Sequence, residues 1–143
     1  MIMSALHSAS AFLETLHGTV FSRFFNRSLG ADIGKDACLM TDALEADLLT
    51  VGTHASVNED CDITCHTVEN MVLKLAPVKL GNQSTLRSYS VVMPGGTMER
   101  SAVLLEQSQV LKGETVTANE RWAGLPAQPF TSAGAEKSPA KST

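Results

Sequence analysis

A histidine and a glutamate near the middle of the chain, His66 and Glu69, are residue types that can carry out acid–base chemistry. An imidazole titrates near neutral pH, so it can take a proton from an attacking amine or hydroxyl. A carboxylate three residues later can hold the imidazole in one tautomer if the chain turns tightly between them. Attack of a nucleophile on a carbonyl carbon needs such a base and a donor for the oxyanion. His66 can equally be a surface histidine without a role, and His54 competes with it as the base.

Three cysteines, Cys38, Cys61 and Cys65, stand near these residues. The C-x3-C-H arrangement is not a usual zinc spacing, and we expect no metal. No neighbourhood that would stabilise a thiolate can be read from the sequence, although Cys65 beside His66 stays under consideration as a nucleophile. We interpret the cysteines as reduced thiols that pack as small apolar groups, which favours a cytoplasmic protein.

A repeat of six residues surrounds this segment and must position it. Every sixth residue of two runs is aliphatic, with Glu45 as the exception: Ile33, Leu39, Glu45, Val51, Val57 and Ile63, then Leu80, Leu86, Val92, Met98, Leu104, Val110 and Val116. A mostly small side chain follows four residues after each of them. This hexad predicts a parallel β-helix, in which three short strands form a triangular coil of about 18 residues. Leu39 should then stack on Val57, and Leu86 on Leu104.

The hexads break between Ile63 and Leu80, which are 17 residues apart. Because 17 is not a multiple of six, the chain must leave the prism after Ile63 and re-enter near Val78 or Leu80. The sequence therefore predicts a projecting loop at about 64–79 that carries His66. About four coils make up the rest of this mainly β domain.

The two ends of the chain differ from the repeat. Residues 1–30 predict an amphipathic helix whose apolar face, which includes Leu13, Val20 and Phe24, docks on its own domain. A helix lying on a membrane surface is the alternative. The β-helix is expected over 31–127 and a disordered tail over 128–143, which has no apolar pattern.

Composition argues against a nucleic-acid partner and against a membrane span. The net charge is −4 and there is no run of lysine or arginine, so a nucleic-acid-binding surface is not expected. No stretch of about 18 uninterrupted apolar residues occurs, so no membrane span is expected. The N-terminal segment also lacks the basic region of a signal peptide.

Taken together, the hexads and the loop resemble the hexapeptide-repeat acyltransferases, which are left-handed parallel β-helices. RSLGADIG (27–34) is similar to the start of their first coil, and RWAGLPA (121–127) to their C-terminal W-x-G-N-P-A, with Leu125 in place of the asparagine. CDITCHTVENMVLKLAPVKLG (61–81), followed by SVVMPGG (90–96), resembles the C-terminal β-helix domains of non-ribosomal-peptide-synthetase-like proteins of the ε-poly-lysine synthetase type.

This resemblance implies transfer of an acyl or aminoacyl group from a thioester, on coenzyme A or on a phosphopantetheinyl carrier protein, to an amine or hydroxyl. It matches His66 to the motif histidine, Glu69 to the acidic position and Asn58 to a polar position before the cysteine-bearing coil.

For the thioester arm, the resemblance suggests the vicinity of Ser90, Gly96 and Trp122. Trp122 could stack on an adenine or cap the open end of the prism, and we favour the cap because an open strand edge invites aggregation.

The resemblance also implies a carrier protein or an adenylating synthetase as partner, a homotrimer, and a secondary-metabolite pathway. The chain has neither an adenylation domain nor a carrier serine motif, so it cannot activate a substrate itself. A non-catalytic scaffold left from a larger synthetase is the alternative. A metal-dependent hydratase would need more histidines than His54 and His66 unless subunits combine them.

Overall fold

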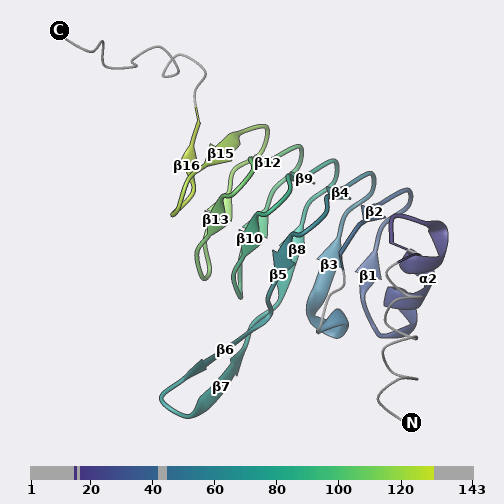
Figure 1. Ribbon diagram of the computed structural model, residues 1–143, viewed down its shortest axis with the longest axis horizontal. Helices are drawn as coiled ribbons and strands as arrows, with labels where there is room; N and C mark the ends of the chain where they lie inside the picture. Colours follow the sequence, from purple (N-terminus) through teal and green to yellow (C-terminus); the bar gives the residue numbers. More distant parts are fainter. Residues whose placement is uncertain (1–14, 16, 42–44, 131–143) are drawn as a thin grey trace, which may run out of the picture.

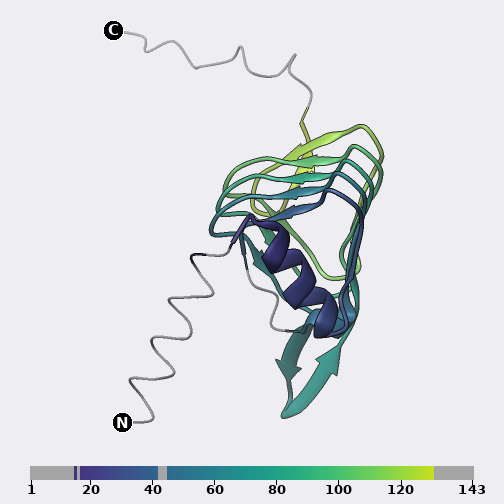
Figure 2. The ribbon, with the colours of Figure 1, turned by 90° about the vertical axis from the view of Figure 1, so that its right-hand side faces the viewer.

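The computed structural model describes residues 15, 17–41 and 45–130, and these form a triangular prism of stacked coils (Figures 1 and 2). The strands of one side are β1 (Asp32–Ile33), β3 (Leu49–Val51), β8 (Val78–Leu80), β11 (Thr97–Met98) and β14 (Thr115–Val116). Those of a second side are β2 (Cys38–Leu39), β4 (Ser56–Val57), β9 (Thr85–Leu86), β12 (Val103–Leu104) and β15 (Arg121–Ala123). The third side has β5 (Asp62–Ile63), β10 (Val91–Val92) and β13 (Gln109–Val110).

Within each side, neighbouring strands of successive coils run parallel, in the register that the hexads predict. Leu39 pairs with Val57, and Leu86 pairs with Leu104. Each pair is 18 residues apart, so both predicted stacks are confirmed and the chain is a parallel β-helix. The last coil ends differently, because β16 (Gln128–Pro129), which lies in the expected tail, pairs antiparallel with β15.

The core is a column of side chains along the prism axis. All twelve aliphatic hexad residues are buried, with at most 3% of their surface exposed. Trp122 continues the column on top of Leu104 and is 9% exposed. Complete burial of one aliphatic side chain contributes about 1.5–3 kcal/mol, so this column is the main source of stability.

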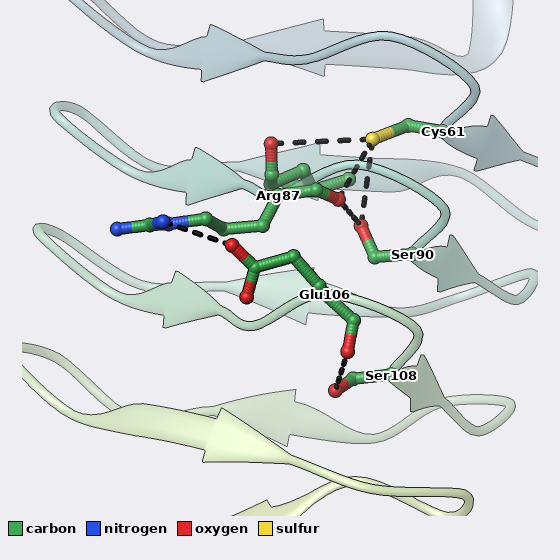
Figure 3. Close-up of polar contacts among 6 residues, drawn as sticks. Cys61, Arg87, Ser90, Glu106 and Ser108 are labelled. Carbon is green, nitrogen blue, oxygen red and sulfur yellow. Dashed lines mark hydrogen bonds and ion pairs between the residues drawn. The ribbon is translucent and has the colours of Figure 1, made fainter.

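Small polar residues at one corner bond to the turns beside them (Figure 3). The hydroxyl of Ser90 donates to the carbonyl oxygen of Arg87 at 2.6 Å, and the thiol of Cys61 donates to the same oxygen at 3.1 Å. One coil further on, Ser108 Oγ donates to the Glu106 carbonyl at 3.2 Å, and the Arg87 guanidinium pairs with the Glu106 carboxylate at 2.9 Å. These small side chains therefore add to the bonding of the turn carbonyls, of which that of Arg87 also accepts from the Ser90 backbone N–H at 3.3 Å.

The helix α2 (Val20–Ser28) lies against the first strands, at the N-terminal end of the prism (Figure 2). Its buried residues are polar, Ser22 and Asn26, and Arg27 Nε donates to the Ile33 carbonyl at 2.9 Å. Val20, Phe21 and Phe24 are exposed instead.

The expectation that the apolar face of this helix docks on its own domain is therefore wrong for the described turns. Asn26 Nδ2 donates instead to the Ser22 carbonyl at 2.9 Å, so the buried amide is satisfied within the helix itself. Leu13, also on the predicted apolar face, lies outside the described residues, as does the tail from residue 131.

The projecting segment is a β-hairpin of two strands, β6 (His66–Glu69) and β7 (Val72–Leu75), which points away from the prism (Figure 1). Its base closes where Ala76 N–H donates to the Cys65 carbonyl at 2.9 Å. Asn70 and Met71 form the turn with φ of 50° and 63°, as in the type I′ turn of two-residue hairpins. After the hairpin the coils resume in register.

Candidate active site

The clearest polar contact at the base of the hairpin joins His66 to Glu45. His66 Nδ1 lies 2.6 Å from Glu45 Oε1. The other carboxylate oxygen, Oε2, accepts a hydrogen bond from the backbone N–H of Cys65 at 3.3 Å. Both oxygens of Glu45 therefore contact the point where the chain leaves the prism.

The two edges of the His66 ring have different surroundings. Nδ1 is buried and lies within ion-pair distance of the carboxylate, without the alignment of a regular hydrogen bond. The side chain as a whole is 33% exposed, so solvent reaches part of the ring. A carboxylate beside Nδ1 favours a proton on that nitrogen, which leaves Nε2 as the acceptor.

Glu45 reaches this place because the third side of the first coil is irregular. A 3₁₀ helix, η1 (Ala46–Leu48), follows Glu45, and the described strands of the third side begin only at β5. Thr41 Oγ1 donates to the carbonyl of Cys61, the residue before β5, at 2.8 Å. A side chain of the first coil therefore bonds to the third side at this place. The sequence carried a signal for this break, since Glu45 is the one charged residue in the hexad series.

Glu69, the expected partner of His66, has different contacts. His66 and Glu69 are three residues apart on one extended strand, so their side chains point to opposite faces of the hairpin. Glu69 Oε2 pairs with Lys74 Nζ at 2.9 Å, and Oε1 pairs with Lys112. The tight turn that would bring Glu69 to the imidazole does not form, because residues 66–69 pair in register with 72–75.

A cavity of about 500 Å³ lies on the Glu69 side of the hairpin. Its lining residues come from the hairpin and from the turns of later coils: Thr67, Glu69, Lys74, Leu75, Ala76, Pro94 and Lys112. Its volume is in the range of small-molecule sites. His66 does not line it.

The other residues that the resemblance suggested do not meet His66. Asn58 follows β4, its backbone N–H donates to the Leu86 carbonyl, and no hydrogen bond between described residues joins it to the imidazole. Ser90 and Gly96 are buried at corners, and the Trp122 ring is buried in the last coil, where Nε1 donates to Glu120 at 2.9 Å. None of these four residues lines the cavity.

The structure also places Cys65, the alternative nucleophile, and His54, the alternative base. Burial raises the pKa of the Cys65 thiol, and the negative charges of Glu45 and Asp47 raise it further, against a backbone hydrogen bond at Val78 that lowers it. A buried thiol with a raised pKa stays protonated near neutral pH and is a poor nucleophile. His54 is exposed and lines a separate, shallower pocket with Thr53, Asn82, Gln83 and Arg100.

Neither a cluster of metal ligands nor a membrane-spanning helix is present among the described residues. Among residues 15, 17–41 and 45–130, no group of three or more His, Cys, Asp or Glu side chains is placed to hold a metal ion. None of the helices in that part of the chain has the length and apolar content to cross a membrane.

Comparison with solved structures defines the class of fold. A maltose O-acetyltransferase from Clostridium difficile 630 superposes with a TM-score of 0.60 at 15% identity, over 76% of this chain and 72% of that one. A hexapeptide-repeat acetyltransferase from Vibrio cholerae, solved with acetyl-coenzyme A, gives 0.61 at 14% identity, over 90% and 87%. The chain therefore has the left-handed parallel β-helix fold of the hexapeptide-repeat acyltransferases, as the sequence resemblance indicated.

A more specific similarity comes from sequence. The chain is 34% identical to the delta-poly-L-ornithine synthetase of Acinetobacter baumannii over 120 residues. These matched residues are 83% of this chain. The matched region is 9% of the length of that synthetase. No protein-family model matches the chain.

Proposed function

We propose that the protein transfers an acyl or aminoacyl group from a thioester to an amine, with His66 as general base and Glu45 as the residue that orients it. The observation that carries this proposal is the 2.6 Å contact between His66 Nδ1 and Glu45 Oε1. In this arrangement one nitrogen of the ring lies against the carboxylate, and the other is the nitrogen that we assign to the substrate.

The reaction needs one proton carrier. The amine nitrogen attacks the thioester carbonyl carbon, and a C–N bond forms while the C–S bond breaks. His66 Nε2 accepts the proton that the amine loses and returns it to the leaving thiolate sulfur, so the histidine is regenerated. Glu45 stabilises the imidazolium that exists between these two transfers.

The comparisons support a thioester as the donor. A relative named as a poly-ornithine synthetase supports an aminoacyl donor, and a fold neighbour that binds acetyl-coenzyme A supports a pantetheine thioester. We infer that the donor is held by a carrier protein that a separate adenylating synthetase loads, in a cytoplasmic, non-ribosomal-peptide-type secondary pathway. Acetyl-coenzyme A is the simpler donor with the same chemistry.

We further infer that the working form is a homotrimer. His66 shares its face of the hairpin with Val68 and Leu73, because these residues alternate on paired strands. Val68 is 68% exposed and Leu73 is 59% exposed. A neighbouring subunit over this face would cover the apolar surface and form a groove for the substrate beside His66. Light scattering of the purified protein measures the mass directly, and a monomer at working concentrations would contradict this inference.

The test of the proposed reaction is release of free thiol from acetyl-coenzyme A or from an ornithyl-loaded carrier protein, with L-ornithine as acceptor. His66→Ala should lower kcat by about 10²- to 10⁴-fold, the usual contribution of a general base. The matched control is His54→Ala, which removes an exposed histidine from another corner and should leave the rate unchanged. Equal loss in both variants, or none in His66→Ala, would exclude His66 as the base.

A non-catalytic scaffold predicts a different result. It would release no thiol with either donor, and neither donor would raise the melting temperature, because a ligand stabilises a protein only when it binds the native state.

A further inference from the structure

The hairpin that carries His66 is attached to the prism by a side-chain contact with a carboxylate on each of its two faces. On one face the His66 imidazole meets Glu45 of the first coil. On the other face Glu69 forms an ion pair with Lys112, which lies in the turn between β13 and β14. These are the contacts of this kind that join hairpin strands to the prism within the described residues.

Other contacts leave the hairpin free to tilt. All four residues of β7 are exposed, and a two-stranded hairpin alone is marginally stable. A cavity of about 500 Å³ on the Glu69 side is lined by hairpin residues together with Pro94 and Lys112, so part of that face is open. The backbone bond between Ala76 and Cys65 fixes the base of the hairpin but not its direction.

Lys112, in contrast, stands on a fixed part of the molecule. The neighbouring Gly113 N–H donates to the Pro94 carbonyl at 3.1 Å, so the turn is bonded to the coil below it. The strands on either side of the turn, β13 and β14, pair with β10 and β11. The ammonium group therefore reaches the hairpin from a rigid support.

We propose that Lys112 is a positioning residue, whose ion pair with Glu69 sets the tilt of the hairpin and so holds His66 against Glu45. Its effect on turnover depends on the proposed acyl transfer, whereas its effect on the hairpin does not. Lys74 provides a matched control, because it pairs with the same carboxylate from within the hairpin and so does not connect it to the prism.

The experiment is amide hydrogen exchange of the hairpin in the full chain. Lys112→Ala should speed exchange across 66–75 by about 2- to 5-fold, which corresponds to the loss of one exposed ion pair. Lys112→Arg should restore the wild-type rate, and Lys74→Ala should change it less than Lys112→Ala does. Exchange in β9, inside the prism, serves as the internal reference and should stay constant.

Salt gives a second, independent readout. At about 1 M salt the screening length falls to about 3 Å, so hairpin exchange in the wild type should rise toward that of Lys112→Ala, which itself should respond little. In the transfer assay, Lys112→Ala should lower kcat about 2- to 5-fold at unchanged KM, and Lys112→Arg should restore it.

Unchanged hairpin exchange in Lys112→Ala, or an equal increase in Lys74→Ala, would overturn the proposal. Absence of thiol release by the wild type would instead reject the proposed reaction, while the exchange data would still decide whether Lys112 holds the hairpin.

Discussion

The prism and the hairpin are two regions of one chain that follow opposite rules. In the prism each aliphatic hexad residue is buried and each strand pairs with the coils beside it. In the hairpin the apolar residues are exposed, and ion pairs rather than packing connect it to the rest. The comparison shows that the prism positions the hairpin. The polar groups able to do chemistry lie where the six-residue repeat is interrupted.

The largest expected effect contrasts a leucine from each region. Leu86 is fully buried in the column, so Leu86→Ala should lower the free energy of unfolding by about 2–5 kcal/mol. Leu73 is 59% exposed on the hairpin, and Leu73→Ala should change the free energy of unfolding by at most about 0.5 kcal/mol. Urea unfolding followed by circular dichroism measures both. Similar losses would show that the hairpin belongs to the same cooperative core.

The second test makes the irregular coil regular. Glu45→Leu restores an aliphatic residue at its hexad position and removes the partner of His66. Stability should stay within about 1 kcal/mol of wild type, while kcat should fall by about 10²-fold because the imidazole is no longer oriented. Thiol release and thermal unfolding are the measurements. Glu69→Gln is the control, which should retain more activity, and a greater loss there than in Glu45→Leu would reverse the assignment.

The smallest effect concerns the hairpin tip. Met71 has φ of 63° and is 97% exposed, in a turn position where glycine is favoured. Met71→Gly should relieve about 1 kcal/mol of backbone strain. We expect slower amide exchange across the hairpin and no change in the melting temperature of the prism. Faster exchange would mean that the Met71 side chain itself stabilises the tip.

The sequence predicted the prism well because one physical rule, an aliphatic residue at every sixth position, repeats along most of the chain. The break between Ile63 and Leu80 likewise predicted where the chain departs. Pairing of His66 with Glu45 could not be read in the same way, because the two are 21 residues apart and meet only through the irregular first coil. Glu69 seemed the natural partner by proximity in sequence, but strand alternation places it on the other face.

The helix shows a second limit of sequence reasoning. Its periodic apolar residues predicted a docked apolar face, yet Ser22 and Asn26 are the residues buried against the prism. Periodicity identifies the two faces of a helix but not which of them packs on the domain, and the buried Asn26 amide is satisfied within the helix by the Ser22 carbonyl.

The way in which the base of the hairpin closes has a consequence for the evolution of such a protein. Ala76 bonds back to Cys65, and Val51 then pairs with Leu80 as it would without the interruption. The coils above are thus insensitive to how many residues lie beyond that junction. Extra pairs of residues inserted at Asn70–Met71 would lengthen the hairpin and leave the prism unchanged. The length of the hairpin can therefore evolve separately from the coils.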